Sequence, residues 1–125
     1  PQLNEIQSLI KGRNNIEYLG ELQESDFNTL FYNVDAICIP SVAAEGFCLP
    51  AKVAYFLNKP VLHTGQGGLN ETLKGFTKSY YFDFKNVTSL TTSLKNILVD
   101  HQNTTTFNIH DGINFEQRLL NLINN

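Results

Sequence analysis

The stretch PSVAAEGFCLP at residues 40–50 decides the fold, because it joins a short apolar run to the start of a helix. The run that precedes it, Ala-Ile-Cys-Ile at residues 36–39, has the length and character of a buried parallel strand. The next helix begins near Leu49 and Pro50 and extends to about Leu57. This order of strand, loop and helix is typical of open α/β sheets, which bind ligands in the loops at the carboxyl ends of their strands.

Hydrophobic periodicity extends the same pattern in both directions along the chain. Strands are predicted at residues 16–19, 36–39, 60–63 and 79–84. Helices are predicted at residues 3–10, 25–34, 49–57, 70–73, 90–98 and 115–123. Gly12 is expected to close the first helix, and Thr88 or Ser89 to cap the fifth. Helices between most of the strands predict an α/β, Rossmann-like fold, in which a mainly parallel, doubly wound sheet carries helices on both faces.

Length and composition narrow the possible classes of function. A chain of 125 residues is expected to form a single domain over residues 1–125. Its formal net charge of -3 provides no general basic surface, so we do not expect nucleic acid as a partner. No apolar run approaches the length of about 20 residues that a membrane span needs, and no signal peptide is recognisable. Cys38 and Cys48 are not spaced for metal binding, and reduced thiols predict a cytoplasmic protein.

Three motifs, in the right order and at roughly the right distances, resemble the group 1 (family 4) glycosyltransferases of the GT-B fold. They are Pro-Ser-x3-Glu-Gly-Phe-x-Leu-Pro at residues 40–50, Asn-Lys-Pro-Val at 58–61 and Gly-Gly-x-x-Glu at 67–71. The resemblance runs from about Asn15 to about Asp100. It implies that residues 1–125 are the C-terminal, nucleotide-sugar donor-binding domain, lacking its first strand or strands. An N-terminal GT-B domain or a partner subunit would then complete the active site.

The resemblance also implies an activity and a set of site residues. The expected reaction is retaining, metal-independent transfer of a hexose-like sugar from a nucleotide-diphosphate sugar to an acceptor, with no cofactor. Glu45 would be the catalytic residue that holds hydroxyl groups of the donor sugar. The residues expected to bind the donor are Gly46, Phe47, Cys48, Leu49, Gly67 and Gly68. A helix N-terminus with available N–H groups can stabilise the departing diphosphate without a metal ion.

Two positions depart from the family pattern. The second acidic residue of the family, which binds the ribose hydroxyls, is replaced by Val53. This loss is expected to weaken ribose binding by about 1–3 kcal/mol, because valine cannot accept a hydrogen bond. Cys48 stands where the family commonly has glycine and would add a side chain beside the sugar pocket. Lys52 is adjacent to Val53 but would point elsewhere on the helix. The Arg and Lys that the family uses to bind the diphosphate would lie upstream of Pro1.

Simpler interpretations of the same residues remain open. Glu45 and Gly46 could serve only as a helix cap and a turn, and residues 65–68 could be a plain turn. Glu71 is an ordinary acidic residue for a first helical turn, and His63 could be packed in the core. At the level of the whole chain, the alternative function is a catalytically degenerate glycosyltransferase-like module that acts as a binding or assembly partner of another protein.

Overall fold

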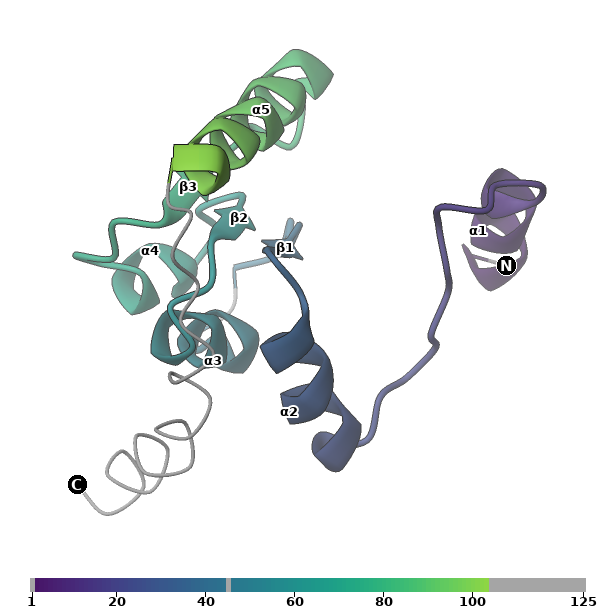
Figure 1. Ribbon diagram of the computed structural model, residues 1–125, viewed down its shortest axis with the longest axis horizontal. Coiled ribbons are helices and arrows are strands. Elements are labelled where there is room, and N and C mark those ends of the chain that lie inside the picture. The colour runs from purple at the N-terminus through teal and green to yellow at the C-terminus, as the bar shows by residue number, and fades with distance from the viewer. Residues whose placement is uncertain (1, 45, 104–125) are drawn as a thin grey trace. The chain divides into compact units, whose positions relative to one another are not determined.

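The structure is a computed structural model that describes residues 2–44 and 46–103 (Figure 1). Contacts within the chain divide it into two compact units, Pro1–Leu30 and Phe31–Asn125. The elements in chain order are α1 (Gln2–Ile10), α2 (Glu24–Asn33), β1 (Ile37–Ile39), α3 (Leu49–Phe56), β2 (Val61–His63), α4 (Leu69–Thr72), β3 (Ser79–Tyr81) and α5 (Val87–Asn103).

The first unit contains α1 and the segment that follows it. α1 ends one residue before Lys11, and Gly12 has φ of 79°, a left-handed conformation that favours glycine at a helix end. These features confirm the predicted first helix and its closing glycine. α1 buries none of its residues, and its apolar side chains Leu3, Ile6 and Leu9 are exposed.

The strand predicted at residues 16–19 is wrong. The structure assigns these residues no regular secondary structure, and Ile16, Tyr18 and Leu19 are each about half exposed. Alternating apolar residues become a strand only when a neighbouring strand takes up their backbone hydrogen bonds. The sequence pattern shows only which side chains are apolar. It does not show whether a neighbouring strand is present.

The second unit is built on a parallel sheet with the strand order β1-β2-β3 (Figure 1). In its register Ile39 lies opposite His63, and His63 lies opposite Tyr81. α3 connects β1 to β2 and α4 connects β2 to β3, as parallel neighbours require a crossover between them. All three residues of β2 are buried, which fits a central strand that is covered on both faces.

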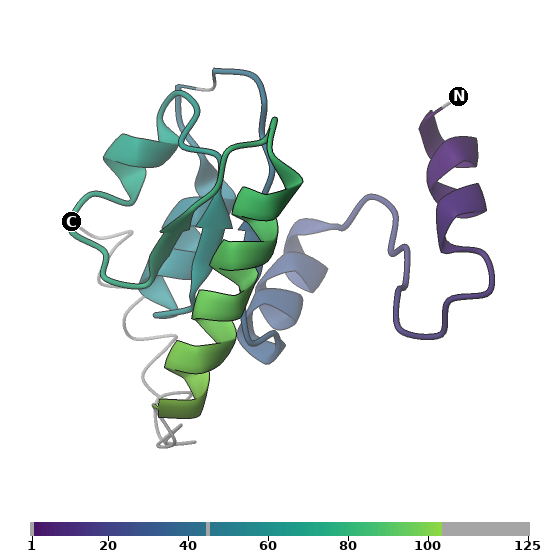
Figure 2. The same ribbon diagram turned by 90° about the horizontal axis from the view of Figure 1, so that it is seen from above.

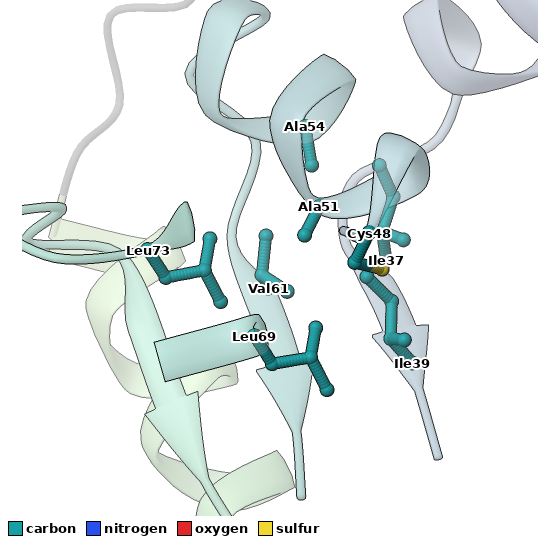
Figure 3. Packing of buried hydrophobic residues seen from close by; sticks show 8 residues of the cluster. All are labelled: Ile37, Ile39, Cys48, Ala51, Ala54, Val61, Leu69 and Leu73. Carbon is teal, nitrogen blue, oxygen red and sulfur yellow. The ribbon is translucent and has the colours of Figure 1, made fainter. Parts of the chain in front are cut away.

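One face of the sheet packs against α3 and α4 (Figure 3). Ala51 and Ala54 lie three positions apart on α3 and are both fully buried, so this face of the helix can approach the strands closely. Phe31 and Val34, at the end of α2 and just beyond it, pack against the same cluster. The buried residues of this cluster are Ile37, Ile39, Cys48, Ala51, Ala54, Val61, Leu69 and Leu73.

The opposite face packs against α5 (Figure 2). Leu62 follows Val61 in β2 and therefore points to the other side of the sheet, where it is buried with Phe82 and Ile97. The hydroxyl of Tyr80 donates a hydrogen bond of 2.5 Å to Oδ2 of Asp100 on α5. Partial burial and this carboxylate raise the pKa of Tyr80 to about 12.

The start of α5 differs from the prediction. The helix begins at Val87, and Oδ1 of Asn86 accepts hydrogen bonds from the N–H groups of Thr88 (3.0 Å) and Ser89 (3.4 Å). Asn86 is therefore the N-cap, because asparagine is one of the best acceptors at this position. Ser89 uses its hydroxyl differently and accepts a hydrogen bond of 2.9 Å from the N–H of Asp83.

The coarse fold prediction is confirmed, since the second unit is an α/β arrangement with a parallel sheet and helices packed against it. The strands and helices predicted between residues 25 and 98 all appear, with ends that differ by a few residues. The helix predicted at residues 115–123 lies outside the described residues.

Candidate functional site

Two loops leave the same edge of the sheet, because β1 and β2 are parallel neighbours whose last residues, Ile39 and His63, are paired. The first loop leads to α3 and the second to α4. The hydroxyl of Thr64, which is buried, donates a short hydrogen bond to the carbonyl oxygen of Ser41. This bond joins the two loops at their bases, so they form one surface at the carboxyl edge of the sheet.

The first loop ends at Cys48, the N-cap of α3, whose carbonyl oxygen accepts a hydrogen bond of 3.2 Å from the N–H of Lys52. The side chain of Cys48 is only 1% exposed and lies in the core cluster beside Ile37 (Figure 3). The expectation that this side chain narrows a sugar pocket is therefore wrong. Because the whole residue is buried, Cys48 does not form part of the loop surface.

Phe47 and Leu49, on either side of Cys48, have exposed side chains. Gly46 is also exposed, which leaves its backbone accessible to a ligand. In helices the first N–H groups have no intrahelical partner, so the start of α3 suits an anion. Glu45, the predicted catalytic residue, lies outside the described residues, and its role stays a prediction.

A groove of about 340 Å³ lies between α3 and α4, next to the first loop. The ammonium group of Lys52 lies 5.1 Å from the centre of the Phe47 ring, a cation–π distance. Lys52 shares this groove with Phe47 and Glu71. The residues that line the groove are Phe47, Lys52, Tyr55, Phe56, Glu71 and Thr72.

The helical spacing of Lys52, Tyr55 and Phe56 was the sequence signal for this groove. Residues at i, i+3 and i+4 share one face of a helix, and here that face carries a cation and two aromatic rings. The ring of Tyr55 also packs against that of Phe76, with ring centres 4.7 Å apart and an angle of 34° between the rings. Without knowledge of where α4 lies, the sequence could not show that this face borders a groove. Val53 is half-buried and is not among the groove residues.

The second loop is held in a specific conformation by its own residues. Gly65 has φ of 69°, and a Cβ atom there would lie 3.1 Å from Oδ1 of Asn70 and 3.2 Å from the Tyr81 ring. The side-chain amide of Asn70 donates a hydrogen bond of 2.9 Å to the carbonyl oxygen of Gly65. Gly67 also has a positive φ of 54°, and Gly68 is the buried N-cap of α4. Positive φ angles therefore favour glycine at positions 65 and 67, and at position 65 the neighbouring side chains also leave little room for a Cβ atom.

His63, at the end of β2, is only 4% exposed and has both ring nitrogens engaged. Nδ1 accepts a hydrogen bond of 3.1 Å from the N–H of Gly65, so Nε2 carries the proton and donates to the hydroxyl of Ser79 at 2.7 Å. Burial lowers the pKa of His63, because it disfavours the charged imidazolium. This arrangement supports a packed, neutral histidine that fixes the start of the second loop.

Stability is therefore expected to depend on pH through His63. The pKa of His63 is lower in the folded state than in the unfolded state, where it is about 6.5. The contribution of neutral His63 to the free energy of unfolding is therefore present above pH 6.5 and is lost as the pH falls below 6.5, because the unfolded state then binds the proton more readily. The expected loss is at most about 1.4 kcal/mol per pH unit below pH 6.5. Urea unfolding at pH 8, 7, 6 and 5 measures it, and His63→Gln should flatten the profile. An equal slope in the variant would contradict this role.

Two classes of feature are not found in the part of the chain that the structure describes. Within residues 2–44 and 46–100 there is no group of three His, Cys, Asp or Glu side chains that could hold a metal ion. Among the described helices, none combines the length and apolar character that crossing a membrane demands.

Comparisons with known proteins give no independent information on this site. The chain matches no protein-family model, no curated protein and no solved structure. The donor-binding roles of Gly46, Phe47, Cys48, Leu49, Gly67 and Gly68 accordingly stay predictions, to which the groove residues Lys52 and Tyr55 are added.

Proposed function

We propose that the chain is the donor-binding domain of a retaining GT-B glycosyltransferase, with a Rossmann-like, doubly wound sheet. It binds a nucleotide-diphosphate sugar and contributes Glu45 to transfer of a hexose-like sugar, without a metal ion. The other domain, or a partner subunit, supplies the acceptor site. The two cysteines do not form a disulfide, which supports a reducing compartment such as the cytoplasm.

The observation that carries this proposal is the joined pair of loops at the carboxyl edge of the sheet. The hydrogen bond from Thr64 to Ser41 links the loop that contains Gly46 and Phe47 to the loop that contains Gly67. Ligands of open α/β sheets bind at such an edge, where a helix N-terminus can receive phosphate. Two of the three motifs that resemble the glycosyltransferases, at residues 40–50 and 67–71, lie on these two loops and the starts of the helices that follow them, whereas residues 58–61 connect α3 to β2.

The groove between α3 and α4 adds a cation to this surface. Lys52 lies one turn into α3, beside Phe47, and its ammonium group can bind a phosphate oxygen through a charge-assisted hydrogen bond. Exposed Phe47 offers an apolar face for a ring of the ligand. In this proposal Lys52 partly replaces the Arg and Lys that the glycosyltransferase family uses to bind the diphosphate.

Val53 favours the second candidate function, a degenerate glycosyltransferase-like module that binds another protein. A half-buried valine on α3 cannot accept hydrogen bonds from ribose hydroxyls. The buried side chain of Cys48 no longer supports this alternative, because it leaves the surface of the loop unchanged. We retain the enzyme as the leading proposal, since the loops themselves are suited to a sugar diphosphate.

A backbone NMR titration of the chain with UDP-glucose, GDP-mannose and ADP-glucose tests the proposal. We expect one donor to shift the amide signals of Gly46, Phe47, Leu49 and Gly67 at millimolar concentration, with or without EDTA. Glu45→Ala should abolish these shifts, whereas Glu21→Ala, the same change at an exposed position of the first unit, should leave them intact. If no donor shifts these signals, the degenerate module becomes the better interpretation.

A further inference from the structure

The imidazole ring of His63 connects two different parts of the second unit through its two nitrogens. Nε2 donates a hydrogen bond of 2.7 Å to the hydroxyl of Ser79, and Nδ1 accepts one of 3.1 Å from the N–H of Gly65. The first bond stays within the sheet, because His63 and Ser79 belong to the neighbouring strands β2 and β3. The second bond leaves the sheet and holds the loop that leads to α4. One nitrogen therefore anchors the ring, and the other fixes the second loop.

Protonation of His63 changes only the bond to the loop. An added proton goes to Nδ1, because Nε2 already carries one in the neutral ring. The N–H at Nε2 still donates to Ser79 in the charged ring. Nδ1 can then no longer accept a hydrogen bond, so its new N–H faces the N–H of Gly65 as a second donor. Neutral His63 therefore holds the second loop, whereas charged His63 is incompatible with the observed position of Gly65.

The contacts of Gly65 carry this change to the surface of the candidate site. Its carbonyl oxygen accepts a hydrogen bond of 2.9 Å from the side-chain amide of Asn70 on α4. Thr64, the residue between His63 and Gly65, donates its hydroxyl to the carbonyl oxygen of Ser41 in the first loop. A displacement of the Gly65 backbone therefore affects both of the loops that are proposed to bind the donor.

The strands on either side of His63 contribute no charged side chain to its surroundings. Ile39 lies opposite His63 in β1, and Tyr81 lies opposite it in β3. The ring of Tyr81 is edge-on to the imidazole, with 6.4 Å between the ring centres. The phenol of Tyr81 is neutral near pH 7, so the two neighbouring strands leave the charge of His63 to its own burial.

The helices on this side of the sheet carry one positive and one negative side chain. Side chains alternate along β2, so His63 is on the side of Val61, where α3 and α4 pack. Lys52 on α3 and Glu71 on α4 line the groove between the two helices, and the thiol of Cys48 is buried in the core cluster. Burial lowers the pKa of His63, so the imidazole is neutral at pH 7 and becomes charged only in acid.

We propose that His63 is a positioning residue whose protonation releases the second loop and weakens ligand binding at the carboxyl edge of the sheet. The release of the loop follows from the contacts of His63 itself, whereas the effect on binding rests on the proposed donor site. Only molecules with a neutral ring are then competent to bind. The dissociation constant should therefore rise by up to about tenfold for each pH unit below the pKa of His63 in the folded chain.

An NMR titration of the full chain between pH 8 and pH 5 tests the release of the loop. We expect the amide signals of Gly65 and Gly67 to shift with the same midpoint as the ring signals of His63, below pH 6.5. The amide signals of Ala54 and Ile97, which are buried on opposite sides of the sheet, should show that the chain remains folded.

Two substitutions separate the charge of His63 from its packing. His63→Asn retains an oxygen that can accept the Gly65 N–H but does not titrate, so the loop signals should become independent of pH. His101→Asn makes the same change in the last turn of α5 and should leave the titration of the loop intact. Loop signals that do not follow His63 would overturn the proposal. So would loss of the Ala54 and Ile97 signals at the same pH, since the whole chain would then unfold.

Donor binding measured at pH 8 and pH 5 distinguishes this inference from the proposed function. UDP-glucose, GDP-mannose and ADP-glucose are the probes, and the dissociation constant of the donor that binds should rise at pH 5 in the natural chain only. An equal rise in His63→Asn, or no rise in the natural chain, would show that His63 does not control binding. If none of the three binds at pH 8, the proposed function is wrong, and the loop titration alone decides the role of His63.

Discussion

Replacing Val53 with glutamate is expected to raise the affinity for a nucleotide sugar by about ten- to a hundredfold. The change places a carboxylate eight positions after Glu45, where the glycosyltransferase family binds the ribose hydroxyls. Val53 is only half-buried, so a glutamate there can reach solvent and a bound ligand. Isothermal titration calorimetry with the donor that causes NMR shifts in the natural chain measures the effect.

Two control variants distinguish a ribose contact from a general change in charge. Val53→Leu retains an apolar side chain and should leave the dissociation constant unchanged. Val99→Glu makes the same substitution at an exposed position of α5, the helix that packs on the other side of the sheet from α3, and should also leave it unchanged. If Val53→Glu binds the donor no better than Val53→Leu, the ribose does not lie beside this position, and the proposed donor orientation is wrong.

Leu62→Ala is expected to lower the free energy of unfolding by about 2–5 kcal/mol. Leu62 is only 2% exposed in the central strand and packs against Phe82 and Ile97. Its truncation removes apolar contacts on the α5 side of the sheet and leaves a cavity that neighbouring side chains fill only in part. Equilibrium unfolding in urea measures the loss.

Val42→Ala provides the matched comparison for this prediction. Val42 is 62% exposed in the loop after β1, so its truncation should cost less than about 0.5 kcal/mol. A cost below about 1 kcal/mol for Leu62→Ala would show that the α5 side of the sheet is not a tightly packed core. The amide signals of residues 46–49 should be little changed in either variant that remains folded.

Much of the second unit could be predicted from the sequence, because its helices and strands carry clear apolar patterns. The run at residues 36–39 and the apolar positions of residues 49–57 each match one element of the structure. The segment at residues 16–19 has an equally clear alternation but is not a strand. Residues 36–39 have a neighbouring strand to pair with, whereas residues 16–19 are not paired in the sheet. A local sequence pattern cannot show whether such a partner strand exists.

The site was less predictable than the fold. The motif positions predicted a site on the loops after β1 and β2, and the structure joins these two loops through Thr64 and Ser41. The direction of individual side chains depends on the exact start of α3 and the position of α4. For this reason Cys48 was expected at the surface and is buried, and the groove that Lys52 lines was not predicted.

The burial of Cys48 has a consequence for how this surface can evolve. The residue belongs at once to the hydrophobic core and to the backbone segment proposed to bind the donor. Its exposed neighbours Phe47 and Leu49 can change to suit a new ligand at little cost in stability. We therefore expect substitutions that change ligand specificity to occur at residues 47 and 49, while the core packing restricts substitutions at position 48.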